Sequence, residues 1–380
     1  MRIAIVTETF VPSVDGVVTR LRHAVERFVD LGHEVMVIAP DLGVHEHHGA
    51  RIVGIRPVTL PFYKHRRFTL PNPTVDGIIR GFHPDVVHAA QPLLLASSGA
   101  YAAHRQDIPL VASYHTHIPR YLDLYRAWRW GKPAVWWQIR RNHALADLNL
   151  ATSRSMAAEL AVHGVENLRV LRRGVDTRAH HPRFASPRMR ERLSGGHPEK
   201  TLLVFVGRLA KEKEIQTLRP MLDRRPDVAL AIVGDGPYRP ELEQTFAGTA
   251  TTFPGFLGGT ELAAAFASAD GFVFPSVTET LGLVILEGMA SGLPVVAARS
   301  GPTTEQVTDG VDGLLYEAGD AASLDRALDA LADPARREGI RARARAEAER
   351  FSWDSASDDL LDCYELAIAE HRRRKGEGAW

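Results

Sequence analysis

The sequence has almost no cysteine and no long apolar segment. Cys363 is the one cysteine among 380 residues, which excludes a disulfide framework and a thiolate metal cluster. No stretch reaches the roughly 18 apolar residues of a membrane-spanning helix, and the first apolar run, residues 3–6, is too short for the core of a secretory leader. These absences predict a protein of the reducing cytoplasm, soluble or lying at the inner face of the cell membrane.

Net charge is absent as well. Lys plus Arg and Asp plus Glu both number 46, so the chain has no general basic field, and no nucleic-acid partner is expected. The cluster His45-Glu-His-His48 resembles a metal site only in composition. It lies in a glycine-flanked polar stretch without further ligands at a fixed spacing, which predicts a solvated loop and no metal.

The length of 380 residues predicts two domains, since single cores rarely grow beyond roughly 250–300 residues. Short apolar runs alternate with helical patterns in both halves, and this alternation predicts α/β domains with parallel sheets covered on both faces. The expected strands include residues 3–6, 33–39, 51–56, 85–89, 110–115, 148–152, 202–206, 228–233, 272–274 and 295–298.

Residues 270–300 carry the clearest functional pattern. An apolar run ends at Pro275, a polar loop with Glu279 follows, and a helical run opens near Gly282 and carries Glu287 before a second apolar run. This order predicts strand, loop, helix and strand. In such a unit the first loop and the helix N-terminus face the ligand crevice, where unpaired N–H groups attract anions. Taken singly, Glu279 could cap a helix and Glu287 could be a solvated charge.

Three further positions suit a phosphorylated ligand. A strand ends in Gly-Arg208 with Lys213 five residues on, and a guanidinium fork beside an ammonium suits a diphosphate, although a structural ion pair is the alternative. A loop ends with Gly16 at a helix start, where a phosphate can approach backbone N–H groups, unless the glycine serves only a tight turn. His115 ends a strand at the expected crevice edge, where a lone histidine is usually structural, but the other motifs favour a functional role for it. Neighbouring His117 is interpreted as structural.

The frame Glu279-Thr-Leu281-Gly282-x4-Glu287-Gly-Met-Ala-Ser-Gly-x-Pro resembles the donor site of retaining glycosyltransferase family 4, and the resemblance covers nearly the whole chain. It implies the GT-B fold, with two Rossmann-like domains facing a central cleft and a C-terminal helix that crosses back to the first domain. The implied domains are an N-terminal acceptor-binding domain (1–182), a linker (183–200), a nucleotide-sugar-binding domain (201–351) and the returning helix (352–380).

The same resemblance implies roles for individual residues. Glu279 would hold hydroxyls of the donor sugar and Glu287 the nucleotide ribose. The diphosphate would contact Arg208, Lys213 and the loop of Gly16, and His115 would lie close to the sugar. The implied catalytic set is His115, Arg208, Lys213 and Glu279, with Gly16, Leu281, Gly282 and Glu287 completing the donor site. Glu214 departs from the pattern, because many relatives have glycine after the lysine.

An aromatic and basic stretch follows His115. Its rings, mixed with arginine and lysine, suit an anionic membrane interface or a lipid or sugar acceptor. A helix hairpin that packs its rings on the domain is the alternative, and the two interpretations can coexist. The candidate residues are Tyr121, Trp128, Trp130, Trp136 and Trp137.

The resemblance thus implies a retaining, metal-independent hexosyltransferase without a cofactor, because the nucleotide sugar is its substrate. The Tyr114-His115-Thr116 and Glu279-Thr-Leu-Gly282 segments are similar to those of GDP-mannose-dependent mannosyltransferases, so GDP-mannose is the preferred donor. A resemblance to sulfoquinovosyltransferases makes a UDP-sugar, glucosyl or sulfoquinovosyl, the alternative; the acceptor would be a lipid or a glycoside. Other classes remain: a nucleotide-sugar epimerase, a hydrolase using Glu279 and Glu287 as an acid pair, and a non-catalytic membrane-binding module. The complete donor-site set argues against these three.

Overall fold

The computed structural model describes residues 1–59, 67–124 and 130–376, and the chain divides into two compact units. The first unit combines Met1–Gly174 with Trp353–Trp380, and the second is Val175–Ser352. The expected linker, 183–200, belongs to the second unit and contains helix α7 (Pro187–Ser194). Where the chain leaves and re-enters the first unit, a Cβ on Gly174 would lie 2.5 Å from the Trp353 ring.

The first unit is built on an eight-stranded sheet in the order β10-β9-β8-β7-β1-β2-β4-β3, parallel except for the short β3–β4 pair. A separate two-stranded ribbon pairs β5 with β6. The elements are β1 (Arg2–Thr7), α1 (Gly16–Asp30), β2 (Glu34–Pro40), β3 (Glu46–His47), β4 (Ala50–Ile55), β5 (Val58–Thr59), β6 (Arg67–Phe68), α2 (Thr74–Phe82), β7 (Val86–Ala90), α3 (Leu95–Gln106), β8 (Leu110–Tyr114), α4 (Ile118–Leu124), α5 (Lys132–His143), β9 (Leu148–Ala151), α6 (Arg154–Val162), β10 (Leu168–Val170) and α15 (Trp353–Arg374).

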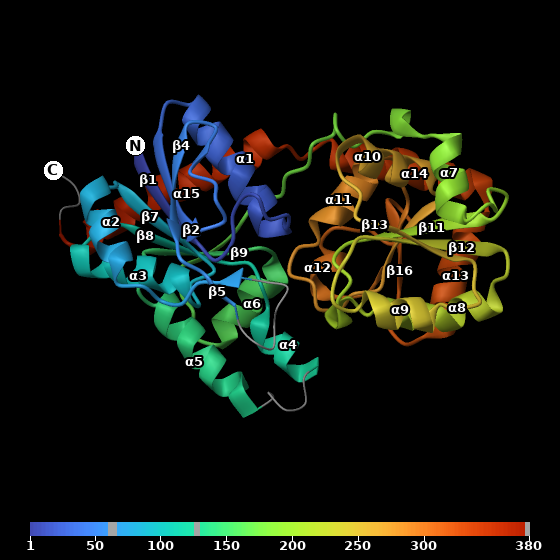
Figure 1. Ribbon diagram of the computed structural model, residues 1–380, viewed down its shortest axis with the longest axis horizontal. Coiled ribbons are helices and arrows are strands. Elements are labelled where there is room, and N and C mark those ends of the chain that lie inside the picture. The colour runs from blue at the N-terminus through green and yellow to red at the C-terminus, as the bar shows by residue number, and fades with distance from the viewer. Residues whose placement is uncertain (60–66, 125–129, 377–380) are drawn as a thin grey trace. The chain divides into compact units, whose positions relative to one another are not determined.

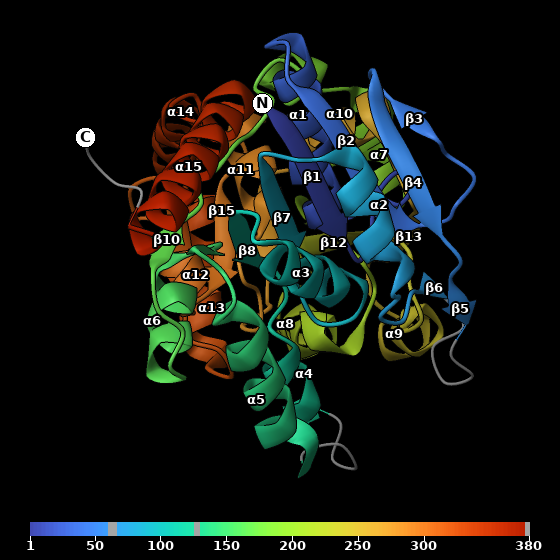
Figure 2. The same ribbon diagram turned by 90° about the vertical axis from the view of Figure 1, so that its left-hand side faces the viewer.

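Alternation along the strands divides the core of the first unit into two layers. Ile3 and Ile5 belong to one layer with residues of α1 and α15, while Ala4 and Val6 belong to the other with residues of α2 and α3. Figure 2 shows these helices beside the first sheet. Helix α1 begins at the N-cap Asp15, and its buried residues recur at helical spacing. Helix α15 lies beside α1 although nearly the whole chain separates them (Figure 1), which confirms the predicted return of the C-terminal helix.

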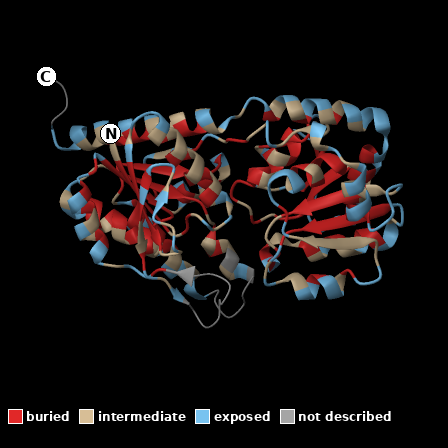
Figure 3. Cartoon of the chain, turned by 45° about the horizontal axis from the view of Figure 1, so that its top comes forward, coloured by how far each residue is buried: buried red, intermediate tan, exposed pale blue. Residues whose placement is uncertain are grey.

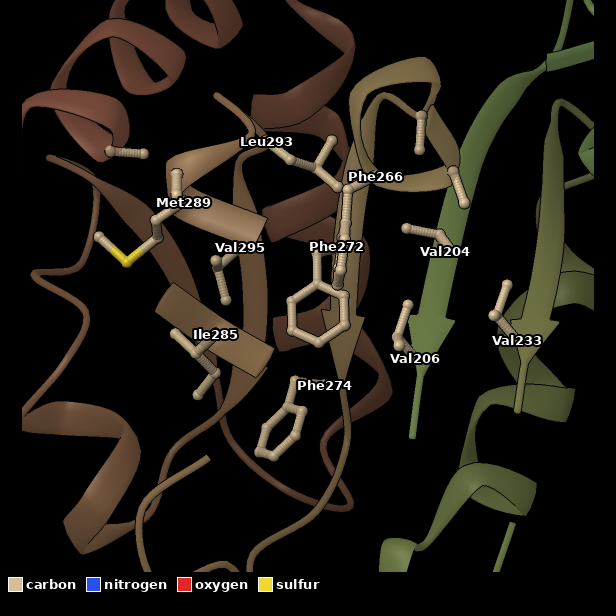
Figure 4. Packing of buried hydrophobic residues seen from close by; sticks show 14 of the residues in the cluster. Val204, Val206, Val233, Phe266, Phe272, Phe274, Ile285, Met289, Leu293 and Val295 are labelled. Atoms are coloured by element: carbon tan, nitrogen blue, oxygen red, sulfur yellow. The ribbon is translucent and has the colours of Figure 1, made fainter. Parts of the chain in front are cut away.

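The second unit is built on a six-stranded parallel sheet in the order β13-β12-β11-β14-β15-β16. One of its two core layers is shown in Figure 4, with Phe272, Phe274 and Ile285 among the side chains. The elements are η2 (Pro182–Phe184), α7, β11 (Thr201–Val206), η3 (Lys211–Lys213), η4 (Ile215–Leu218), α8 (Arg219–Arg224), β12 (Val228–Val233), α9 (Arg239–Thr245), β13 (Thr251–Gly255), α10 (Gly259–Ser268), β14 (Gly271–Phe274), α11 (Leu283–Ala290), β15 (Val295–Ala298), α12 (Gly301–Thr304), β16 (Gly313–Tyr316), α13 (Ala321–Ala332) and α14 (Pro334–Ala348).

Both sheets are buried within helical layers, and exposed residues gather on the outer helix faces (Figure 3). The strand order reverses between β1 and β7 in the first sheet and between β11 and β14 in the second. Ligands of open α/β sheets bind beyond the carboxyl ends of the strands at such reversals. No helix in the described ranges is long and apolar enough to cross a membrane.

Candidate active site

In the second unit, the reversal between β11 and β14 brings two loops together: residues 207–214 after β11 and residues 275–282 after β14. The first loop carries Arg208 and Lys213, and the second carries Glu279. The structure therefore groups three of the predicted site residues at the carboxyl ends of two adjacent strands, where the sequence placed them.

The backbone around Arg208 is held by the turn that follows β12. The Leu209 N–H donates to the Asp235 carbonyl at 2.9 Å, and a Cβ on Gly234 would lie only 1.9 Å from the Gly207 carbonyl oxygen. A Cβ on Gly236 would likewise lie 2.3 Å from the Leu209 carbonyl oxygen. The glycines of this Gly-Asp-Gly turn are thus required by close packing on the Arg208 loop.

Arg208 is held on its side chain as well. Its guanidinium donates a hydrogen bond to the carboxylate of Glu212, one turn later, and Glu212 is buried. A buried carboxylate needs such a partner, because an uncompensated charge away from water is costly. Glu212 therefore positions the guanidinium, a role that the sequence analysis missed.

Lys213 and Glu279 form an ion pair between the two loops. Burial alone would raise the pKa of Glu279, but the charge and hydrogen bond of Lys213, the Thr280 N–H and the charge of Arg208 together lower it below its ordinary value. Glu279 is thus ionised at neutral pH, and both partners lie at the strand ends with most of their surface covered.

Glu214 links the loop of residues 207–214 to the loop of residues 275–282. Its backbone is left-handed, with φ 54°, a conformation that favours glycine. Its carboxylate accepts a hydrogen bond from the Val277 N–H at 3.0 Å. The adjacent Glu212 carbonyl accepts from the hydroxyls of Ser276, at 3.2 Å, and Thr278, at 2.8 Å. The departure from glycine therefore adds a link to the Glu279 loop.

Helix α11 begins at the end of that loop. Gly282 is its N-cap with φ 69°, and a Cβ there would lie 3.3 Å from Glu279 Cγ, so glycine suits both the turn and the neighbouring carboxylate. Leu281 is buried, and its carbonyl accepts a hydrogen bond from the Gln306 side chain.

Glu287 lies on the second turn of α11. Its carboxylate has no hydrogen bond or ion pair with any residue in the described ranges, and burial raises its pKa to about 7. An unpaired and largely buried carboxylate is costly for the fold, so it indicates a ligand-binding group.

In the first unit, Gly16 opens α1 directly after the N-cap Asp15. Gly16 is exposed and its φ is not positive, so the turn itself does not require glycine. The Asp15 carboxylate already accepts from the N–H groups of Val17, at 3.0 Å, and Val18, at 2.9 Å. An anion approaching this helix would therefore meet fewer unoccupied donors than the sequence suggested.

His115 follows β8 and is buried. Gln91, at the end of the adjacent β7, accepts through its side-chain oxygen from the N–H groups of His115, at 2.6 Å, and Thr116, at 2.7 Å. His117 is also buried and pairs with Glu159 at 2.9 Å, which agrees with its structural interpretation.

Glu8 was also missed by the sequence analysis. It follows β1 at the reversal point, and its carboxylate accepts from the N–H groups of Leu94, Leu95 and Ala96 at 2.7–3.1 Å, so it caps α3. Burial raises its pKa to about 7 although these bonds oppose the shift. Its partners lie more than eighty residues away in sequence, which hides the cap from local patterns.

The aromatic candidates separate into different environments. Trp136 is buried and stacks on His163 with ring centroids 3.6 Å apart, so it belongs to the core. Trp130 and Trp137 are 92% and 52% exposed. Trp128 and the side chain of Tyr121 lie outside the described residues.

Two family profiles match the chain. The profile described as Glycosyltransferase Family 4 matches residues 14–179, and the one described as Glycosyl transferases group 1 matches residues 200–333. The chain is 38% identical to the sulfoquinovosyl transferase of Arabidopsis thaliana, covering 95% of this chain and 73% of that protein. It is 36% identical to the GDP-mannose-dependent alpha-mannosyltransferase of Mycolicibacterium smegmatis, covering 98% of this chain and 100% of the relative.

Solved structures agree in fold. The Anabaena protein HepE in complex with UDP and glucose matches with a TM-score of 0.78 at 22% identity, covering 96% of this chain and 99% of that one. Sucrose-phosphate synthase from Thermosynechococcus elongatus matches with a TM-score of 0.76 at 19% identity, covering 97% and 99%. The fold is that of the GT-B glycosyltransferases, which act on nucleotide sugars. The chain belongs to glycosyltransferase family 4, a family of retaining hexosyltransferases.

Proposed function

We propose that the protein transfers mannose from GDP-mannose to a hydroxyl of a lipid or glycoside acceptor. The observation that supports GDP-mannose as the donor is the match to a GDP-mannose-dependent relative over nearly the full length of both chains. The sulfoquinovosyl relative, 38% identical, favours a UDP-linked sugar as the second candidate, but the chain covers a smaller share of it.

The proposed chemistry needs stabilisation of a leaving diphosphate. Arg208 and Lys213 supply fixed positive charge, and each such group contributes roughly 3 kcal/mol to lowering the barrier. As the bond from the anomeric carbon to the diphosphate breaks, the acceptor oxygen bonds on the same face and its proton passes to the leaving phosphate. The family resemblance assigns the sugar hydroxyls to Glu279, the ribose to Glu287 and a role near the sugar to His115. No step requires a metal.

Thermal unfolding with GDP, UDP, ADP and their sugar conjugates tests the donor, since a ligand that binds only the folded state raises apparent stability. GDP and GDP-mannose are expected to raise the unfolding temperature selectively, and Glu287→Ala is expected to abolish the shift. Glu241→Ala, at an exposed glutamate of α9, is the matched control. Selective stabilisation by UDP would move the donor to a UDP-sugar, and no response to any nucleotide would contradict the proposal.

The acceptor side is proposed to include contact with an anionic membrane through α5. This helix buries Trp136 and Ile139, while Trp137, Arg140 and Arg141 are exposed on the other side. The Arg141 guanidinium lies 5.1 Å from the Trp137 ring centroid. Exposed tryptophan beside arginine suits the interface of anionic lipid.

Co-sedimentation with vesicles tests this contact. Vesicles rich in phosphatidylglycerol are expected to bind the protein more than pure phosphatidylcholine, less at high salt, and less with Trp130→Ala/Trp137→Ala. Phe256→Ala, which removes a 63% exposed ring of the second unit, is expected to bind normally. Equal binding of all variants would contradict the role of α5.

A further inference from the structure

A chain of buried hydrogen bonds links the C-terminal helix to His115. The Tyr364 hydroxyl on α15 lies 2.8 Å from His88 Nδ1. On the other side of the ring, His88 Nε2 lies 2.7 Å from Ser113 Oγ. The same Oγ lies 2.7 Å from His115 Nε2. All four side chains are buried in the first unit, and together we call them the histidine relay.

The direction of these bonds follows from counting donors. The Tyr364 hydroxyl has no second hydrogen-bond partner in the described ranges, so it donates to His88 Nδ1, since an unpaired buried donor costs roughly 1–3 kcal/mol. His88 then carries its hydrogen on Nε2 and donates it to Ser113. Ser113 has one hydroxyl hydrogen, which it gives to the remaining partner, His115 Nε2.

Both histidine rings are neutral in these surroundings. Burial lowers the pKa of His88 to about 3 and that of His115 well below its ordinary value, and in both cases the charge of Arg20 adds to the effect. Arg20 is itself buried on α1, where its guanidinium donates to the Arg172 carbonyl at 2.9 Å.

We infer that the C-terminal helix sets the tautomer of His115: Tyr364, acting through His88 and Ser113, fixes the ring hydrogen on Nδ1. The effect of this tautomer on transfer rests on the proposed function, in which His115 lies near the donor sugar. In this tautomer Nδ1 carries the hydrogen and the Nε2 lone pair accepts from the Ser113 hydroxyl, so Nε2 cannot act as a general base. Tyr364, His88 and Ser113 are positioning residues.

Two-bond proton–nitrogen correlation spectra of the ligand-free protein, labelled with nitrogen-15 histidine, test the inference. They distinguish protonated from unprotonated ring nitrogens, and His115→Gln assigns the signals. We expect His115 to show a protonated Nδ1 and an unprotonated Nε2 in the native protein. Tyr364→Phe and Ser113→Ala, which break the relay at two points, are each expected to give averaged tautomer signals. Tyr114→Phe removes another buried tyrosine hydroxyl, and should leave them unchanged.

A native His115 protonated on Nε2, or unchanged signals in both relay variants, would overturn the inference. In transfer assays, Tyr364→Phe should lower kcat roughly 10-fold with little change in donor KM, and Tyr114→Phe should change neither. The expected loss of kcat is smaller than the loss that a wholly wrong histidine tautomer causes in the catalytic triad of a serine protease. The spectra need no substrate. If GDP-mannose proves not to be the donor while the spectra agree, the proposed function fails and the relay stands.

Discussion

At the scale of single residues, Glu287, the proposed ribose ligand, lowers the stability of the fold at neutral and alkaline pH. Its pKa is about 7 in the folded protein against 4.5 as the ordinary value, so the folded state resists its ionisation. The protonated form therefore contributes stability that is fully present below pH 4.5 and is lost as pH rises through 7. By linkage the loss amounts to at most roughly 3 kcal/mol.

Glu287→Gln is therefore expected to stabilise the protein at pH 8 and to have little effect at pH 4.5, because the amide carries no charge to bury. Thermal unfolding at several pH values measures the difference from the native protein, which should grow between these limits. The same variant should lose stabilisation by nucleotide. Glu241→Gln is the control, and a difference that stays constant with pH would contradict the explanation.

At the scale of elements, side-chain contacts tie η3 and the residue after it to the loop before α11. Lys213 pairs with Glu279, while Glu212 and Glu214 bind the backbone and hydroxyls of residues 276–278. Breaking one partner of a covered ion pair leaves the other uncompensated, so the single changes cost more than the pair is worth.

A double-mutant cycle of Lys213→Ala and Glu279→Ala should therefore be strongly non-additive. Urea unfolding is expected to show an interaction energy of roughly 1–3 kcal/mol, with the double variant less destabilised than the sum of the single ones. Lys211→Ala, at an exposed lysine of the same element, should combine additively with Glu279→Ala. Additive behaviour of Lys213 and Glu279 would mean that their contact contributes nothing.

The features that could be predicted from the sequence are those that patterns of neighbouring residues reveal. The strands, the frame from Glu279 to Glu287 and the Arg208 and Lys213 positions are short-range signals, because a run of apolar residues ending in glycine or proline marks a strand end. Glu8, Gln91 and Tyr364 were missed, since their partners lie far along the chain. A helix cap or a buried relay of this kind becomes visible only when topology brings its ends together.

At the scale of the whole molecule, the chain has separate cores in its two units. The last helix, α15, completes the first core with Leu360, Cys363, Tyr364 and Ala367, so a segment near residue 360 stabilises strands near residue 5. Leu331 on α13 is equally buried in the second unit. A core substitution should therefore destabilise mainly the unit in whose core the residue lies, whatever its position in the sequence.

Leu360→Ala and Leu331→Ala form a matched pair for this test, since each removes one buried leucine side chain at a cost of roughly 2–5 kcal/mol. Hydrogen exchange is expected to speed up in β1, β7 and α1 for Leu360→Ala, while β11 to β16 stay protected. Leu331→Ala should give the reverse pattern and should weaken stabilisation by nucleotide, because the proposed donor groups lie in its unit. If Leu360→Ala sped up hydrogen exchange equally in both units, the two cores would unfold as one cooperative system. Helix α15 would then stabilise the loops of residues 207–214 and 275–282 as well as the sheet on which it packs.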